Sequence, residues 1–137
     1  MKQDAANKIL ETRLTAGYAG GVPILRANSP VERTAPSGMF ATFNIDPIQS
    51  ENVGLGNARS RTTGMIIIEL YIPLGTGTRT GMSTIEVFGD VFRNQDFSGV
   101  MCYERILDEV GAITLEGEDI RRYKISCMIP FYYDRTD

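Results

Sequence analysis

Apolar residues recur along the chain at two different spacings, which predict two helices and six strands. Apolar side chains repeat every three to four positions over residues 4–16 and again over residues 80–94, as in amphipathic helices. Elsewhere apolar and polar residues alternate, as in half-buried strands, over residues 23–27, 39–45, 62–74, 99–107, 110–116 and 121–133. Loops are expected at residues 29–38 and 46–61, which are rich in proline, glycine and polar side chains.

The order of these elements, α-β-β-β-α-β-β-β, indicates the fold class. Strands that follow one another on both sides of a single helix are typical of an α+β domain. We therefore expect a mostly antiparallel sheet with two helices packed on one face. A chain of 137 residues has room for one such domain, so residues 1–137 are expected to form it.

The strand predicted at residues 62–74 has two unlike apolar faces. Its even positions should supply the core beneath the helices: Ile66, Ile68, Leu70 and Ile72. The odd positions then lie on the opposite side, where an unpaired Glu69 would be costly inside a second core. The remaining odd positions are too apolar to form one patch in water. A subunit interface with a polar rim satisfies both facts, and we predict it at Met65, Ile67, Glu69 and Tyr71.

The composition excludes several kinds of active site. The chain has no histidine, so neither a Ser–His or Cys–His pair nor a histidine-ligated metal site is possible. Cys102 and Cys127 are far apart in the sequence and lie in apolar stretches, so they are interpreted as buried thiols. We therefore expect no catalytic residue, no metal and no cofactor. Neither a secretory signal nor a membrane-spanning run is present, which favours a protein made in a reducing cytoplasm.

The charge is modest and unevenly distributed. The formal net charge is −3, which argues against a dedicated nucleic-acid binder. Residues 1–68 hold seven basic and five acidic groups, whereas residues 69–137 hold seven and twelve. Arg59 and Arg61 form an isolated basic pair beside the polar stretch. In an acidic protein such a pair is better suited to salt bridges with a protein partner than to DNA readout.

A glycine-rich turn offers an alternative, enzymatic interpretation. Gly75, Gly77 and Gly81 lie between a predicted strand and a predicted helix, where a dinucleotide fingerprint would be found. However, Thr80 occupies the third glycine position, and the chain offers one strand–helix–strand crossover rather than a series. A small nucleotide-binding enzyme that uses the Gly75–Gly81 turn is therefore the less favoured hypothesis.

One family is suggested by a run of glycines, core residues and short motifs. The run contains Arg61-x-x-Gly64, the strand from Ile66 to Tyr71, the segment Ile72-Pro73-Leu74-Gly75-Thr76-Gly77-Thr78, the helix ending in Phe92, and Phe97-Ser98-Gly99-Val100. Together with the first helix (Ile9 to Leu14) and Asn28 before a proline, this pattern resembles the tail-terminator-like proteins of long-tailed bacteriophages. The resemblance covers most of the chain.

The resemblance implies a structural protein of the virion without enzymatic activity. Copies of the chain would form a ring, hexameric in that family, at the head-proximal end of the tail tube. The ring would stop tube polymerisation, contact the tail tube protein and present a surface to the head–tail connector (stopper) protein. DNA would only pass through the lumen, where an acidic wall would repel its phosphates. A head-completion or adaptor protein of the same junction is the alternative, because it would share the ring geometry.

Overall fold

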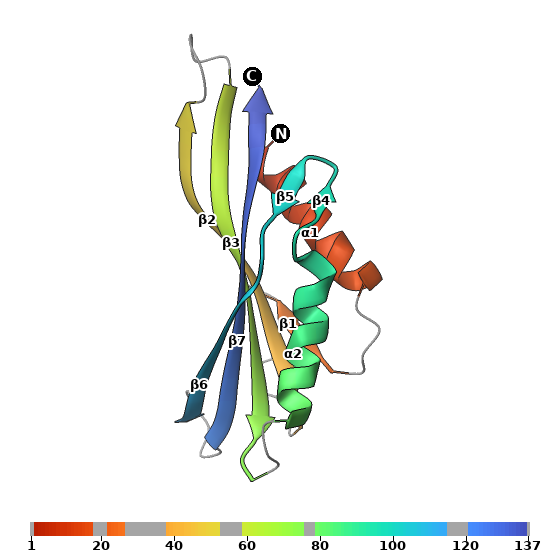
Figure 1. Cartoon of the computed structure of the whole chain (residues 1–137), viewed down its shortest axis with the longest axis vertical. Coiled ribbons are helices and arrows are strands. Elements are labelled where there is room, and N and C mark those ends of the chain that lie inside the picture. The colour runs from red at the N-terminus through yellow and green to blue at the C-terminus, as the bar shows by residue number, and fades with distance from the viewer. Residues whose placement is uncertain are drawn as a thin grey trace.

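Two helices lie on one face of a twisted, mostly antiparallel sheet (Figure 1). This architecture comes from a computed structural model, which describes residues 2–17, 22–26, 38–52, 59–75, 79–114 and 121–136. Within this part of the chain the elements are α1 (Gln3–Gly17), β1 (Ile24–Arg26), β2 (Phe40–Asn52), β3 (Arg59–Pro73), α2 (Arg79–Phe92), β4 (Asp96–Phe97), β5 (Val100–Cys102), β6 (Ile106–Thr114) and β7 (Arg121–Thr136).

The sheet is built around β7, the last strand in the sequence. Its strand order is β1-β2-β3-β7-β5-β4, and β6 also pairs with β7. Among the described strand pairs, β1 with β2 alone is parallel. β5 and β6 occupy successive stretches of β7, because β5 pairs opposite residues 131–133 and β6 opposite residues 121–128. The predicted α+β class, with a mostly antiparallel sheet and both helices on one face, is confirmed.

The core lies between the helices and the sheet, as the apolar spacing predicts. α1 buries Ala6, Leu10 and Leu14, while α2 buries Ile85, Phe88 and Phe92. The even positions of β3 are fully buried beneath them: Ile66, Ile68, Leu70 and Ile72. Inward side chains of β7 complete the core: Ile125, Cys127, Ile129, Phe131 and Tyr133.

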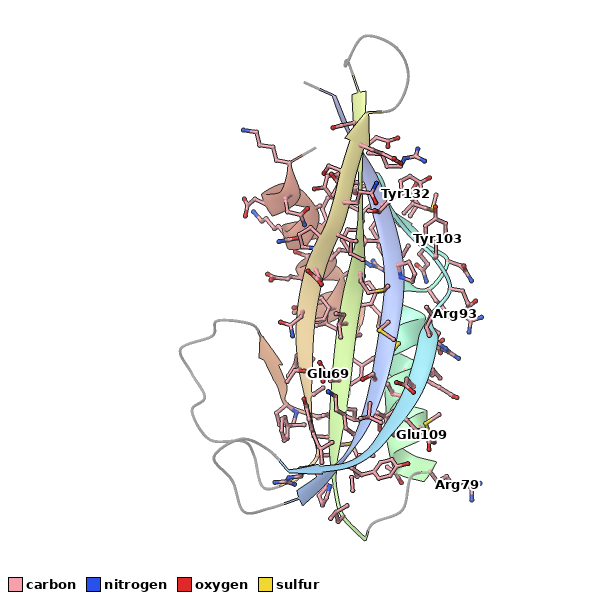
Figure 2. The ribbon with its side chains drawn as sticks, turned by 90° about the vertical axis from the view of Figure 1, so that its left-hand side faces the viewer. Glu69, Arg79, Arg93, Tyr103, Glu109 and Tyr132 are labelled. Atoms are coloured by element: carbon pink, nitrogen blue, oxygen red, sulfur yellow. The ribbon has the colours of Figure 1, made fainter. Side chains whose placement is uncertain are left out.

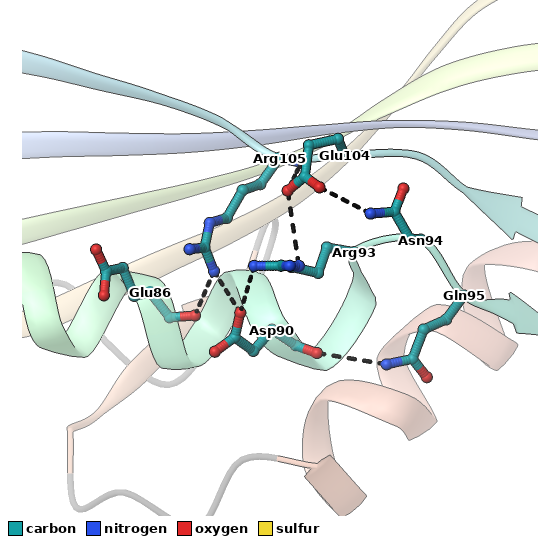
Figure 3. A network of polar contacts seen from close by, with 7 residues as sticks. All are labelled: Glu86, Asp90, Arg93, Asn94, Gln95, Glu104 and Arg105. Atoms are coloured by element: carbon teal, nitrogen blue, oxygen red, sulfur yellow. Dashed lines mark hydrogen bonds and ion pairs between the residues drawn. The ribbon is translucent and has the colours of Figure 1, made fainter.

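The single strand predicted at residues 99–107 is wrong. β5 ends at Cys102 and β6 begins at Ile106, so four described strands follow α2 instead of three. At the break, a polar network ties Glu104 and Arg105 to the C-terminal part of α2 and the residues that follow it (Figure 3). The carbonyl oxygen of Tyr103 also accepts a hydrogen bond of 3.0 Å from the Asn94 backbone amide. The Arg105 guanidinium binds the Asp90 carboxylate and donates to the carbonyl oxygen of Glu86 at 3.2 Å. Gly89 makes room for it, since a Cβ there would lie 2.7 Å from Cδ of Arg105.

The loop predicted at residues 46–61 is wrong for most of its length. β2 runs to Asn52 and β3 starts at Arg59. Pro47 does not end β2, because the strand register shifts between Pro47 and Gln49, a bulge that accommodates proline. Residues 53–58 lie outside the described residues. Of the other predicted loop, at 29–38, only Gly38 is described.

Candidate functional site

The face of the sheet opposite the helices is the candidate site, and Figure 2 views it directly. Strand alternation places the odd residues of β3 on this open face. Met65 and Ile67 are both half-buried there. No described helix covers this face, and the strand partners of Met65 and Ile67 lie on β2 and β7.

The register of the sheet adds three apolar residues to these two. Met65 lies opposite Pro130 on β7, and Ile67 lies opposite Met128. Met128 in turn lies opposite Ile106 of β6, whose side chain is 48% exposed. Side chains of directly opposed residues point to the same face of a sheet. The result is a continuous apolar band, here called the open-face stripe: Met65, Ile67, Ile106, Met128 and Pro130.

A cluster of two tyrosines and an arginine continues the stripe toward one end of the sheet. The Arg61 guanidinium binds the Asp134 carboxylate through two hydrogen bonds of 2.8 and 3.1 Å, which raises the pKa of Arg61. Its Cζ lies 4.2 Å from the centre of the Tyr132 ring. Tyr132 contacts Tyr103, with ring centres 5.6 Å apart, and Tyr103 is 48% exposed (Figure 2). Tyrosine and arginine held in a fixed geometry are typical of the energetically dominant residues of protein interfaces.

The opposite end of the open face is polar, and its charged group Glu69 already has partners within the subunit. Glu69 forms an ion pair with Lys124 and accepts a hydrogen bond of 3.0 Å from the Tyr71 hydroxyl. Tyr71 stacks on Phe40 at 4.8 Å and is 9% exposed. Burial, and then the Glu69 charge, raises the pKa of Tyr71 to about 12. Glu69 is therefore not an unpaired carboxylate, and Tyr71 has little surface left to offer a partner.

The structure thus joins some of the residues singled out in the sequence and separates others. Met65 and Ile67 lie in the open-face stripe, whereas Glu69 and Tyr71 lie at the polar end of the open face. Arg61 belongs to the tyrosine–arginine cluster, while the Arg59 side chain lies outside the described part of the chain. Sequence reasoning missed the even residues of β7 on this face: Met128, Pro130 and Tyr132. Their alternation with the buried odd residues was the available signal.

The described residues show no arrangement that indicates an active site. No three of their cysteine and carboxylate side chains lie together as a metal site would require. Burial raises the pKa of Cys102 to about 12 and that of Cys127 to about 11, which makes both thiols poor nucleophiles. Gly81 has a packing role, because a Cβ there would lie 2.0 Å from Cδ1 of Ile72. Residues 76–78 of the glycine-rich turn lie outside the described residues. Neither described helix combines the length and the apolarity needed to cross a membrane.

Comparison with known proteins supports the fold and leaves the family open. No family model and no curated protein sequence matches this chain. Among solved structures, twelve chains match. One of them, whose name carries no functional description, superposes with a TM-score of 0.67 at 16% identity, covering 100% of this chain and 98% of its own. At such low identity the likeness shows the fold alone, and this fold is therefore shared by a solved protein of nearly the same length.

Proposed function

We propose that this chain is a structural subunit that assembles with copies of itself into a ring terminating the tail tube of a long-tailed bacteriophage. The observation that carries the self-association is the open-face stripe with its tyrosine–arginine cluster. The assignment to a phage tail rests on the resemblance of the β3 and α2 motifs to tail-terminator-like proteins.

The open-face stripe supports an interface because of its composition and its position. Its members are apolar and lie side by side on a face that no described helix covers. A contiguous exposed apolar patch rimmed by polar groups is typical of an interaction site. Here the rim is supplied by the Arg61–Asp134 pair at one end and the Glu69–Lys124 pair at the other. Fully burying a side chain such as Ile67 is worth about 2 kcal/mol, and a ring contains that contact once per subunit.

In this role the ring contacts the tail tube protein on one side and the head–tail connector on the other. Arg61 is neutralised by Asp134, so it would contact a partner mainly through its stacked, planar surface. DNA would pass through the lumen without being bound, which agrees with the acidic balance of residues 69–137.

The proposal predicts that Ile67→Asp yields a folded subunit that no longer forms rings. A carboxylate in the middle of the stripe would have to be desolvated on assembly, which is costly without a partner. Phage complemented with this variant should carry tubes of uncontrolled length, measured by electron microscopy, while circular dichroism reports the fold. Ser83→Asp, which adds the same charge on the exposed surface of α2, is the matched control and should leave tube length unchanged.

Two outcomes would contradict the proposal. Normal rings from folded Ile67→Asp protein would show that the stripe is not part of the subunit interface. A gold-labelled chain found away from the head–tail junction would contradict the role as tail terminator. A label on the head side of the junction would instead favour a head-completion protein.

A further inference from the structure

The helix-covered side of the molecule carries a groove between α1 and the strand β4, which lie side by side (Figure 1). The groove has a volume of about 610 Å³. Ala5 and Ile9 of α1 line it together with Phe97, so part of its wall is apolar. These residues leave an open, partly apolar channel on a face that the open-face stripe does not use.

The charges that line this groove are unbalanced in favour of the positive sign. Lys8 and Arg13 project from α1, and Arg13 lies over the Phe97 ring at 4.6 Å. The acid of the groove, Asp96, is engaged internally, because its carboxylate accepts a hydrogen bond of 3.0 Å from the Gly99 amide. Within the described part of the chain, Lys8 has no ion-pair partner. The groove therefore suits an extended segment that combines carboxylates with apolar side chains.

The edge strand β6 of the same chain has this chemistry. Asp108 and Glu109 are adjacent and exposed, and β6 contains no basic residue. Ile106 and Val110, each 48% exposed, flank them. In the described residues β6 pairs with β7 alone, so its outer edge is free. Glu109 accepts a hydrogen bond from the Tyr123 hydroxyl at 2.9 Å, whereas Asp108 has no ion-pair partner in the described part of the chain.

We infer that the groove between α1 and β4 binds the acidic edge strand β6 of a neighbouring copy of this chain. This inference rests on the proposed function and specifies how its subunits meet. The groove and β6 are different surfaces of the molecule, so the contact is heterologous, the type that closes into a ring when the rotation between subunits allows it. β6 also contributes Ile106 to the open-face stripe. The acidic edge of β6 and the stripe therefore form one continuous surface of the subunit.

β1 covers the outer edge of β2 at residues 41–43, and pairing of β6 with the rest of that edge is disfavoured by charge. β2 carries Asp46 and Glu51 and no basic residue. Like charges that face one another across an interface repel and suppress the wrong partner. The groove with Lys8 and Arg13 offers the opposite sign. It also agrees with the charge of the two halves of the chain, because basic groups outnumber acidic ones in residues 1–68 (seven against five) and acidic groups outnumber basic ones in residues 69–137 (twelve against seven).

A charge-exchange experiment tests the inference. The groove variant is Lys8→Glu/Arg13→Glu and the edge variant is Asp108→Lys/Glu109→Lys. Each variant alone presents like charges on both contacting surfaces, so self-association should weaken by about tenfold or more. An equimolar mixture should assemble again, because each subunit then finds opposite charges on both neighbours. Oligomer mass is measured by light scattering at 50 mM and 1 M salt, and the wild-type chain should assemble more weakly at high salt.

Controls separate the contact from folding and from an edge-protecting role of the acids. Lys2→Glu, which adds negative charge before α1 but outside the groove, should assemble as the wild type does. If the double groove variant does not fold, Lys8→Glu and Asp108→Lys are mixed instead, since both side chains are exposed. Asp108 and Glu109 could alternatively serve only to keep the edge of β6 from aggregating. In that case the edge variant would fold but aggregate, and adding the groove variant would not restore assembly.

The inference is overturned if either folded variant alone assembles like the wild type, if the mixture stays unassembled, or if the wild-type chain is monomeric at both salt concentrations. The proposed function fails differently. In that case rings form and respond to charge exchange as expected, but tube length in phage does not depend on them.

Discussion

At the scale of single residues, the two thiols make the stability of the protein sensitive to alkaline pH. Cys102 and Cys127 are buried, and burial raises their pKa to about 12 and about 11 from an ordinary value of 9.0. Above pH 9 the unfolded chain therefore releases protons that the folded chain retains. The free energy of unfolding is unaffected below pH 9 and should fall by about 1.4 kcal/mol per thiol for each further pH unit, until the folded pKa is reached.

Thermal unfolding between pH 7 and pH 11 measures this loss. The variant Cys102→Ala/Cys127→Ala is the control and should show a shallower decline, although Tyr71 will still contribute above pH 10 because its pKa is also raised. Equal slopes for the two proteins would show that the thiols ionise as readily in the folded state as in the unfolded state.

Gly64 is a residue whose lack of a side chain is required by packing. A Cβ at this position would lie 2.6 Å from the Phe131 ring and 2.8 Å from the carbonyl oxygen of Asp46. Backbone and a buried ring cannot both withdraw, so we expect Gly64→Ala to lower the free energy of unfolding by about 1–3 kcal/mol. Urea denaturation measures the change. Gly38→Ala, where a Cβ would have no neighbour within 4 Å, should stay close to the wild type, and an equal loss there would refute the packing explanation.

At the scale of elements, local periodicity predicts the helices and the core side of β3 well. α1 and α2 each lie within two residues of their predicted ends, because an apolar stripe of helical spacing is a local signal. The extension of β2 and β3 was not predictable in this way. It depends on cross-strand pairs such as Ser50 and Thr62, whose hydroxyls lie 2.8 Å apart, and not on apolar alternation. Pro47 added to the error. In a sequence, proline indicates the end of a strand, whereas in this structure it is accommodated at a bulge within β2.

The polar network between α2 and residues 103–105 should stabilise the break between β5 and β6. Removing the guanidinium in Arg105→Ala leaves Asp90 without its closest cation and should cost about 1–3 kcal/mol, because Arg105 is largely buried and bonded to a charged group. Chemical denaturation gives the loss, and hydrogen exchange should speed up at residues 103–106. Arg79→Ala removes an exposed arginine at the start of α2 and serves as the comparison. An effect no larger than that of Arg79→Ala would mean that the network is only a surface feature.

At the scale of the whole molecule, the sequence predicts which side of β3 is open but not what surrounds it. Ile67 and Met65 belong to one strand, and alternation alone places them on a common face. Their neighbours Met128 and Pro130 are brought there by the β3–β7 register, which joins segments far apart in the chain. The same distance explains why Glu69 seemed unpaired, since Lys124 is its partner only once the sheet has formed.

The central place of β7 also has a consequence for how the protein is made. β3, β5 and β6 all pair with this one strand, and in the described part of the chain none of them pairs with another of the three. During translation, residues 59–114 leave the ribosome before their common partner has been synthesised. In the nascent chain, apolar strands such as β3 therefore remain exposed without β7, their partner in the sheet. This situation slows folding and favours aggregation. For this fold, chaperone protection until β7 has been synthesised should matter more than protection of the helix α1.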